Sequence, residues 1–217
     1  MKYRIFRAAL LGMSLLVSAQ ASIITINFDD PGMTNLVQVS NQYPNVTFSS
    51  VGGDVVLITS QNPPYLGSVP NLICTGTLGG PFPDCTHDLI VTFTNPVSNL
   101  SFGAYGNHTA LGQAFGSLDI SFVSGVVVTG IPLLVTHTNK CPLPAEDCYV
   151  DPVDLPYSGI TQIVLHTTDE AGTAYDDFTF TQAATPNPEP STLMLTGLCG
   201  IFWTGRRFLA RKNRKNT

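Results

Sequence analysis

The stretch Leu89-Ile90-Val91-Thr92-Phe93 decides the fold class of this chain, because it joins β-branched and aromatic side chains without a helical period. Such residues pack well on a pleated sheet, and short runs of them bounded by Gly, Pro, Asn or Asp predict strands. The same pattern returns along most of the chain. Further strands are predicted at residues 23–28, 46–48, 55–59, 97–105, 118–123, 126–129, 133–136, 160–167 and 178–181.

Many short strands separated by turn residues predict an all-β domain, a single β-sandwich of jelly-roll type. No window of the sequence shows a sustained helical stripe with charged faces. The domain is expected to cover residues 22–182, which is long enough to bury one sizeable core.

The first 21 residues have the three parts of a secretory signal peptide. Three basic residues precede the apolar run of residues 8–17, and Ala19-Gln20-Ala21 fits the small-x-small cleavage pattern. We therefore expect export of the chain, with cleavage before Ser22.

The last 35 residues contain a second candidate targeting segment. Residues 183–190 form a linker that ends in the triplet Pro188-Glu189-Pro190, and the run from Ser191 to Gly205 is apolar and uncharged. As a helix this run would span about 22 Å, which is short against a hydrocarbon core of about 30 Å. Residues 206–217 begin with Arg206-Arg207 and hold six basic residues, which favour a cytoplasmic C-terminus.

This C-terminal pattern resembles the PEP-CTERM sorting signal of exported bacterial proteins. The resemblance covers only the Pro-Glu-Pro triplet, the small polar Ser191, the apolar run with glycines and the Arg cluster. It implies handling by an exosortase, anchoring in the inner membrane before cleavage near the triplet, and then a place at the cell surface or in the extracellular matrix. It implies nothing about the activity of the domain, and an ordinary C-terminal membrane anchor is the alternative.

Charge is distributed very unevenly along the chain. Of the 15 acidic residues only Glu189 lies outside residues 22–187, and of the ten Lys and Arg only Lys140 lies inside. This region therefore carries 14 acidic residues against one basic residue, a net charge of −13. Such a surface repels nucleic acid and anionic lipid. It favours divalent cations, although solubility alone also accounts for an acidic surface.

Four of the five cysteines lie in the exported domain, and Cys199 lies in the apolar run. Cys74 and Cys85 bracket one short loop, and Cys141 and Cys148 bracket another. An oxidising compartment favours disulfides, and we expect the two local pairs rather than a crossed pairing. Neither spacing fits a zinc knuckle.

Two acidic pairs lie near the ends of the domain: Asp29-Asp30 after the first strand and Asp176-Asp177 at the start of the last. In jelly rolls the first and last strands commonly pair, which would bring the four carboxylates together. We therefore expect a structural calcium ion on these residues, because crowded carboxylates repel and a cation removes that cost. The ends also resemble those of calcium-bearing, carbohydrate-binding-like jelly rolls. Solvated turns are the alternative, since Asp29-Asp30-Pro31-Gly32 is a good turn sequence.

Enzyme signatures are missing from the sequence, which has neither a Gly-x-Ser-x-Gly elbow nor a His-Glu-x-x-His motif. We therefore expect a non-catalytic surface or matrix protein that binds polysaccharide, with a secreted carbohydrate-active hydrolase or a purely structural calcium-stabilised module as alternatives. The only tryptophan, Trp203, lies in the apolar run, so sugar stacking would fall to tyrosines. The candidates are Tyr65, Tyr105, Tyr149 and Tyr157. The four histidines, at positions 87, 108, 137 and 166, are read as ordinary strand or loop residues, with His87-Asp88 the one acid–base or metal candidate.

Overall fold

A computed structural model describes residues 21–59, 71–77, 84–107, 110–140, 147–169 and 172–183. Its strands are β1 (Ser22–Ile26), β2 (Gln38–Val39), β3 (Val46–Ser50), β4 (Val55–Thr59), β5 (Leu72–Gly76), β6 (Leu89–Asn107), β7 (Ala114–Phe122), β8 (Val127–Leu134), β9 (Thr138–Lys140), β10 (Asp147–Thr167) and β11 (Thr173–Gln182). A single 3₁₀ turn, η1 (Val51–Gly53), is the only helical element among the described residues. No helix in this part of the chain is long and apolar enough to cross a membrane.

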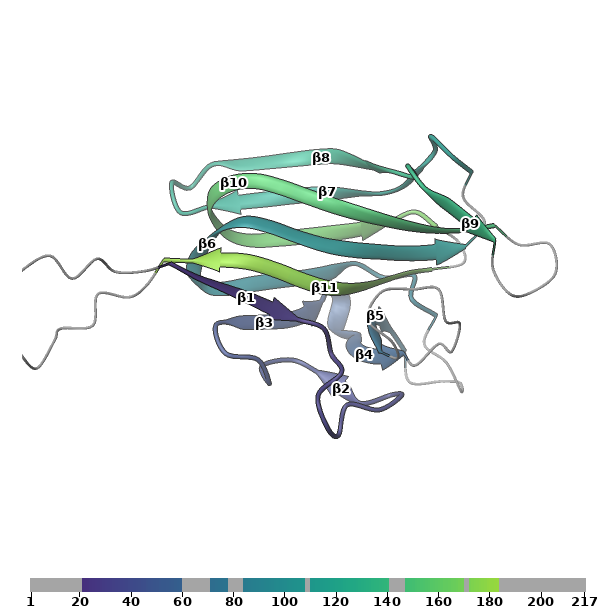
Figure 1. Ribbon diagram of the computed structural model, residues 1–217, viewed down its shortest axis with the longest axis horizontal. Coiled ribbons are helices and arrows are strands. Elements are labelled where there is room, and N and C mark those ends of the chain that lie inside the picture. The colour runs from purple at the N-terminus through teal and green to yellow at the C-terminus, as the bar shows by residue number, and fades with distance from the viewer. Residues whose placement is uncertain are drawn as a thin grey trace, which may run out of the picture. The chain divides into compact units, whose positions relative to one another are not determined.

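The strands form one large antiparallel sheet with the order β2-β4-β5-β11-β6-β10-β7-β8. β1 adds to β11, β3 to β6 and β9 to β10. The domain is thus all-β, as the sequence predicts (Figure 1). The jelly-roll order of the strands stays a prediction.

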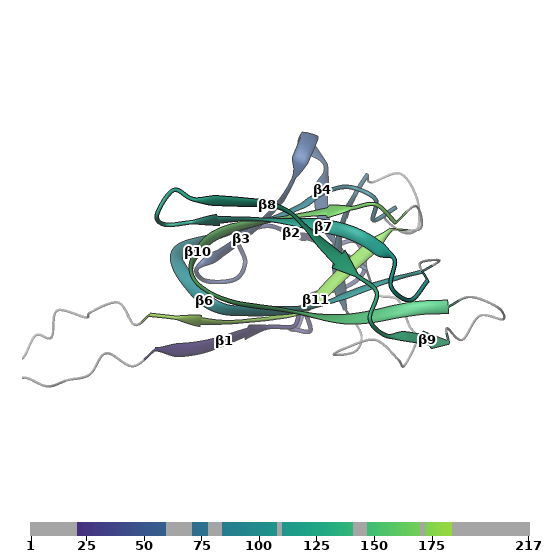
Figure 2. The same ribbon diagram turned by 90° about the horizontal axis from the view of Figure 1, so that it is seen from above.

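The long strands β6 and β10 fold this sheet into two layers (Figure 2). Their pairing slips at three places between Leu155 and Gln162, and both strands bend there. Such bulges bend strands and increase their twist. One layer holds β3, β7, β8 and the halves of β6 and β10 that pair through Gln162–Leu165. The other holds β1, β11, β9 and the remaining halves of β6 and β10.

One hydrophobic cluster includes buried side chains from both layers. Alternate residues of each strand point inward, for example Leu100, Phe102 and Ala104 of β6. Phe28, Phe48 and Phe178 pack edge to face with ring centroids 5.4–6.1 Å apart. Each such pair contributes about 0.5–1.5 kcal/mol beyond its burial.

The predicted strands are mostly found, but their limits differ where proline misleads a local pattern. β6 runs through Pro96 and joins two predicted strands, and β10 begins at Asp147 although residues 147–159 contain two prolines. From residue 150 to 158 β6 is the only described strand that pairs with β10, so that the other side of β10 is an edge of the described sheet. An edge tolerates Pro152 and Pro156, which donate no ladder hydrogen bond.

Candidate functional site

A β-bulge in β11 separates the environments of Asp176 and Asp177. Asp176 pairs with Gly103 and Thr179 with Ser101, so that β11 contains one residue more than β6 between these two pairs. Asp177 takes the left-handed conformation, φ 52°, which Asp tolerates better than most residues. Asp176 is fully buried, whereas Asp177 is half-buried and faces a groove.

This groove lies across β10, β6 and β11 and has a volume of about 340 Å³. It is lined by Ser101, Phe102, Gly103, Tyr105, Pro152, Asp154, Asp177 and Thr179. Ser101, Gly103 and Tyr105 alternate along β6 with the main-core residues Leu100, Phe102 and Ala104, so they lie on the outer face of their layer. The volume falls in the range of small-ligand sites, about 300–1,000 Å³.

A second hollow of about 160 Å³ shares Ser101 and Asp154 with the groove and continues along the same two strands to Asn99 and Pro156. From Asn99 to Tyr105 the floor runs over seven residues of β6, and the six steps between them span roughly 20 Å at 3.3 Å per residue. The site is therefore elongated, which suits a chain better than a compact small molecule.

Tyr105 closes one end of the groove. A Cβ built on Gly103 would lie 2.7 Å from Cζ and 2.9 Å from Cε2 of Tyr105, and closer still to its hydroxyl, so the ring leans over the glycine. Burial, with the nearby charges of Asp176 and Asp177, raises the pKa of Tyr105. The phenol therefore stays protonated and is available as a hydrogen-bond donor.

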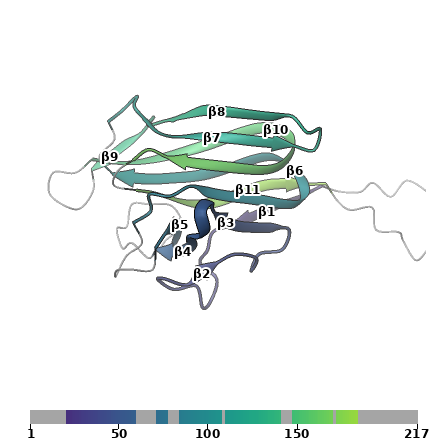
Figure 3. The ribbon, with the colours of Figure 1, turned by 180° about the vertical axis from the view of Figure 1, so that it is seen from behind.

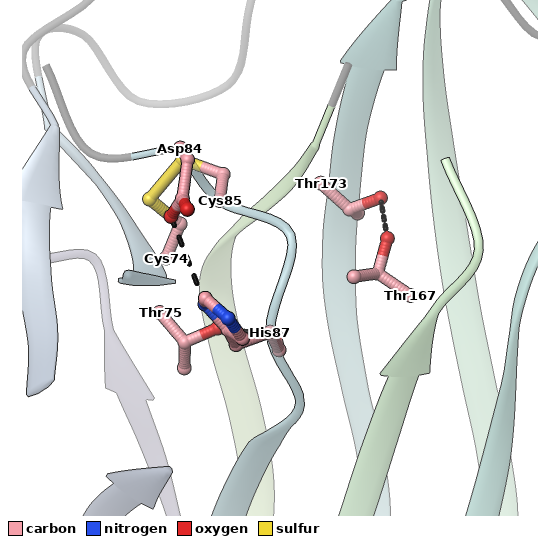
Figure 4. The surroundings of a disulfide bond; sticks show 7 residues. All are labelled: Cys74, Thr75, Asp84, Cys85, His87, Thr167 and Thr173. Carbon is pink, nitrogen blue, oxygen red and sulfur yellow. Dashed lines mark hydrogen bonds and ion pairs between the residues drawn. A yellow bond between two sulfur atoms is a disulfide. The ribbon is translucent and has the colours of Figure 1, made fainter. Parts of the chain in front are cut away.

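The disulfide between Cys74 and Cys85 supports this end of the groove. Both cysteines, together with Leu72 and Ala174, form a small hydrophobic cluster with Tyr105. The Thr75 hydroxyl donates to the His87 carbonyl, and Thr167 and Thr173 share a 2.8 Å hydrogen bond nearby (Figure 4). The predicted Cys74–Cys85 pairing is confirmed. Cys141 lies outside the described residues, as does the side chain of Cys148, so their pairing stays a prediction.

The groove is acidic. Asp154 and Asp177 line it, and none of the described residues in its lining is Lys or Arg. Hydroxyl groups of Ser101 and Thr179 and the phenol of Tyr105 complete its polar lining. These groups suit hydroxyl-rich, uncharged ligands, whereas an anionic ligand would meet like charge.

The predicted pairing of the first and last strands is present, and it brings three of the four predicted calcium ligands around Tyr43. Ile26 of β1 lies opposite Phe178 of β11. Burial, with the charge and hydrogen bonding of Asp30 and the charges of Asp176 and Asp29, raises the pKa of Tyr43 to about 12.

Asp29 also has a structural task, because it accepts a 3.2 Å hydrogen bond from the backbone of Asn71. The fourth predicted ligand, Asp177, faces the groove instead. No group of three or more metal-ligating side chains is arranged for an ion in the described parts of the chain. Calcium binding therefore stays a prediction.

The three described histidines are not among the residues that line the groove. His166 lies between two carboxylates, with Nδ1 2.6 Å from Asp88 Oδ2 and Nε2 3.3 Å from Asp119 Oδ2. His87 Nδ1 lies 3.7 Å from both Asp54 Oδ2 and Asp84 Oδ1. His87 and Asp88 each contact other residues, and their role as an acid–base or metal pair stays a prediction. His108 lies outside the described residues.

The buried carboxylate of Asp151 joins the end of β8 to β10. Asp151 Oδ1 accepts from the backbone nitrogens of Thr136 and His137 at 2.8 and 2.9 Å. It is 2% exposed and lies on the inner face of β10, so it serves the fold rather than the groove.

Tyrosine stacking is not the mode of binding that this groove offers. Tyr105 is 5% exposed, and Tyr157 packs against Phe122 in the middle of β10. Tyr65 and the side chain of Tyr149 lie outside the described residues. The sequence missed Asp154, because a single Asp between Val153 and Leu155 has no distinguishing local pattern.

No family of known proteins and no curated protein matches the sequence. Among solved structures, the family 22 xylan-binding domain of Paenibacillus barcinonensis Xyn10C shares 14% identity, covers 78% of this chain and 99% of its own, and has a TM-score of 0.35. The K2 cleaved adhesin domain of Lys-gingipain shares 13% identity over 75% of this chain and 99% of its own, with a TM-score of 0.41. The C-terminal family 22 carbohydrate-binding module of Clostridium thermocellum Xyn10B shares 13% identity over 73% and 98%, with a TM-score of 0.31. At these TM-scores the likenesses determine neither the fold nor the function of this chain.

Proposed function

We propose that this domain is a non-catalytic, exported module that binds a neutral polysaccharide along the groove between Tyr105 and Asn99. The observation that supports the proposal is the elongated hollow itself, lined by hydroxyl, phenol and carboxylate groups on the outer face of β6, β10 and β11. Carboxylates accept hydrogen bonds from sugar hydroxyls, and the tyrosine hydroxyl can donate or accept. The described lining carries carboxylates and neither Lys nor Arg, which disfavours acidic polysaccharides.

Affinity electrophoresis in gels containing soluble xylan, a neutral β-glucan or alginate tests this proposal. We expect retardation by a neutral polymer and none by alginate, which is anionic. Asp154→Ala and Asp177→Ala should each weaken binding about tenfold, the equivalent of 1.4 kcal/mol. Asp84→Ala removes the same charge outside the groove and should bind like the parent. Binding that is unchanged in both groove variants would refute the proposal.

A hydrolase is the second candidate, favoured by one observation: two carboxylates, Asp154 and Asp177, line the same groove. Glycosidases need such a pair on either side of the bond they cleave. Against it, Asp154 is exposed, and a surface groove does not exclude water from a reacting bond. Release of reducing ends from the same polymers, abolished by Asp154→Asn, would favour the hydrolase over the binding module.

We further propose that the chain is exported, held in the membrane by Ser191–Gly205, and then processed by an exosortase near Pro188-Glu189-Pro190. The sequence patterns at residues 1–21 and 188–207 support this. Mass spectrometry of the mature protein should find neither Met1 nor Thr217. A mature protein that keeps both ends would refute the processing model, whatever the groove binds.

A further inference from the structure

The turn between β7 and β8 exposes a group of valines. Val123, Val126, Val127 and Val128 are 68%, 54%, 56% and 42% exposed, and we call these four residues the valine turn. Tyr157, 45% exposed, lies beside it with its ring 5.9 Å from that of Phe122. Residues 120–136 contain no charged side chain, in a region that carries a net charge of −13. An exposed apolar group of this kind marks an interaction surface.

The valine turn lies at the end of the domain where the chain leaves β11. Phe122, at the end of β7, pairs with Ile160 of β10, and Ile160 also pairs with Val97 of β6. Val97 in turn pairs with Gln182, the last residue of β11. Figures 1 and 3 show the β7–β8 turn at the same end as the outer ends of β1 and β11. The valine turn and the end of β11 therefore lie at the same end of the domain.

Only seven residues, 184–190, separate the last described residue from the apolar run Ser191–Gly205. Fully extended, seven residues reach at most about 25 Å. We propose that the valine turn inserts into the interfacial layer of the bilayer that holds this apolar run, so that the domain rests on the membrane before processing. The inference rests on the membrane placement proposed above for residues 191–205, and it is independent of polysaccharide binding.

A zwitterionic lipid surface fits the valine turn better than a second copy of the chain. Pairing of two copies through the edge of β8 is hindered, because Pro132 has no N–H and Gly130 takes a left-handed conformation, φ 70°. The N–H of Gly130 is also used, since it donates to Asp119 Oδ1 at 2.8 Å. An uncharged apolar tip lets an acidic domain contact lipid without bringing carboxylates to the headgroups.

Tryptophan fluorescence of the full chain in phosphatidylcholine vesicles tests the inference. Trp203→Phe removes the only tryptophan, and Val127→Trp then places a single reporter in the valine turn. Leu111→Trp is the matched control, since Leu111 is 64% exposed and lies at the far end of the same hairpin. At that end of the hairpin Gly112 N donates to Val135 O. The nine residues of β7 separate this end from the valine turn by roughly 30 Å. Flotation with the vesicles shows whether the apolar run Ser191–Gly205 holds the protein in the membrane. Quenching by brominated acyl chains shows whether the valine turn contacts lipid.

We expect both variants to float, and quenching to be several-fold stronger at position 127 than at position 111. Equal quenching at the two positions, or none at position 127 in floating protein, overturns the inference while leaving the anchor intact. A blue-shifted but unquenched Trp at position 127 also overturns it and assigns the turn to contact with a second copy. Protein that does not float overturns the membrane placement of residues 191–205 and the inference with it, without bearing on the groove.

Discussion

The imidazole of His166 and the carboxylate of Asp88 lie 2.6 Å apart, Nδ1 to Oδ2, although 78 residues separate them in sequence. Asp119 approaches the other ring nitrogen at 3.3 Å. Burial of the ring opposes its charge, but the hydrogen bonds and charges of Asp88 and Asp119 outweigh this and raise the pKa of His166. The residue thus links β10 to β7 and to the start of β6, and its two carboxylate partners favour the charged form of the ring.

Stability should depend on the protonation of His166. Because its pKa is raised in the folded state, the contribution is complete below the unfolded pKa of about 6.5 and is lost as pH rises through the folded pKa. A double-mutant cycle with His166→Gln and Asp88→Asn, measured by urea unfolding, should give a coupling of about 0.2–1 kcal/mol at pH 5.5, since the pair is partly exposed. The coupling should fall by pH 8.5, and a coupling that does not change with pH would contradict this assignment.

The Cys74–Cys85 disulfide should stabilise both the fold and the groove. Replacing both cysteines by Ala should lower the free energy of unfolding by about 3 kcal/mol on the chain-entropy estimate for a loop of this length. Binding of the neutral polymer should weaken as well, because Tyr105 packs in the same cluster as the disulfide. Urea unfolding and affinity electrophoresis measure the two effects. The corresponding Cys141→Ala and Cys148→Ala pair should lower stability without weakening binding.

Two glycines should respond differently to alanine. A Cβ on Gly116 would collide with the backbone carbonyl of His166, which cannot rotate away, so Gly116→Ala should cost about 1–3 kcal/mol of stability. A Cβ on Gly103 would meet the Tyr105 side chain, which can move. Gly103→Ala should therefore cost less stability but weaken polymer binding, because the displaced ring enters the groove. Equal losses of stability in the two variants would show that the ring of Tyr105 is held rigidly.

Calcium should stabilise the domain if the carboxylates near Tyr43 bind it. At 100 times Kd, binding to the folded state alone would add about 2.7 kcal/mol, which raises the melting temperature by several degrees. Melting should be compared in calcium and in chelator at constant high ionic strength, so that general screening is equal. Asp30→Asn should blunt the response, and Asp54→Asn should not. Equal melting temperatures in calcium and in chelator would leave Asp29 and Asp30 as turn residues. The calcium response of Asp177→Asn shows whether the groove takes part in calcium binding.

The sequence predicted features that depend on neighbours along the chain. Runs such as Leu89–Phe93 form strands because β-branched and aromatic side chains favour a half-buried pleated surface. The Cys74–Cys85 bridge agrees with the short separation of the two cysteines, 11 positions in sequence. The acidic character of the groove follows from composition, since Lys140 is the single basic residue between positions 22 and 187.

The tertiary structure alone decided which distant residues meet. Asp154 and Asp177 share a groove, and His166 lies between Asp88 and Asp119, because of the register of β6, β10 and β11 and the bulges in them. Side chains alternate with a period of two, so a shift of one residue moves every side chain to the other face of the sheet. The register depends on the packing of the whole core at once, and no local pattern around Asp154 or Asp177 contains it.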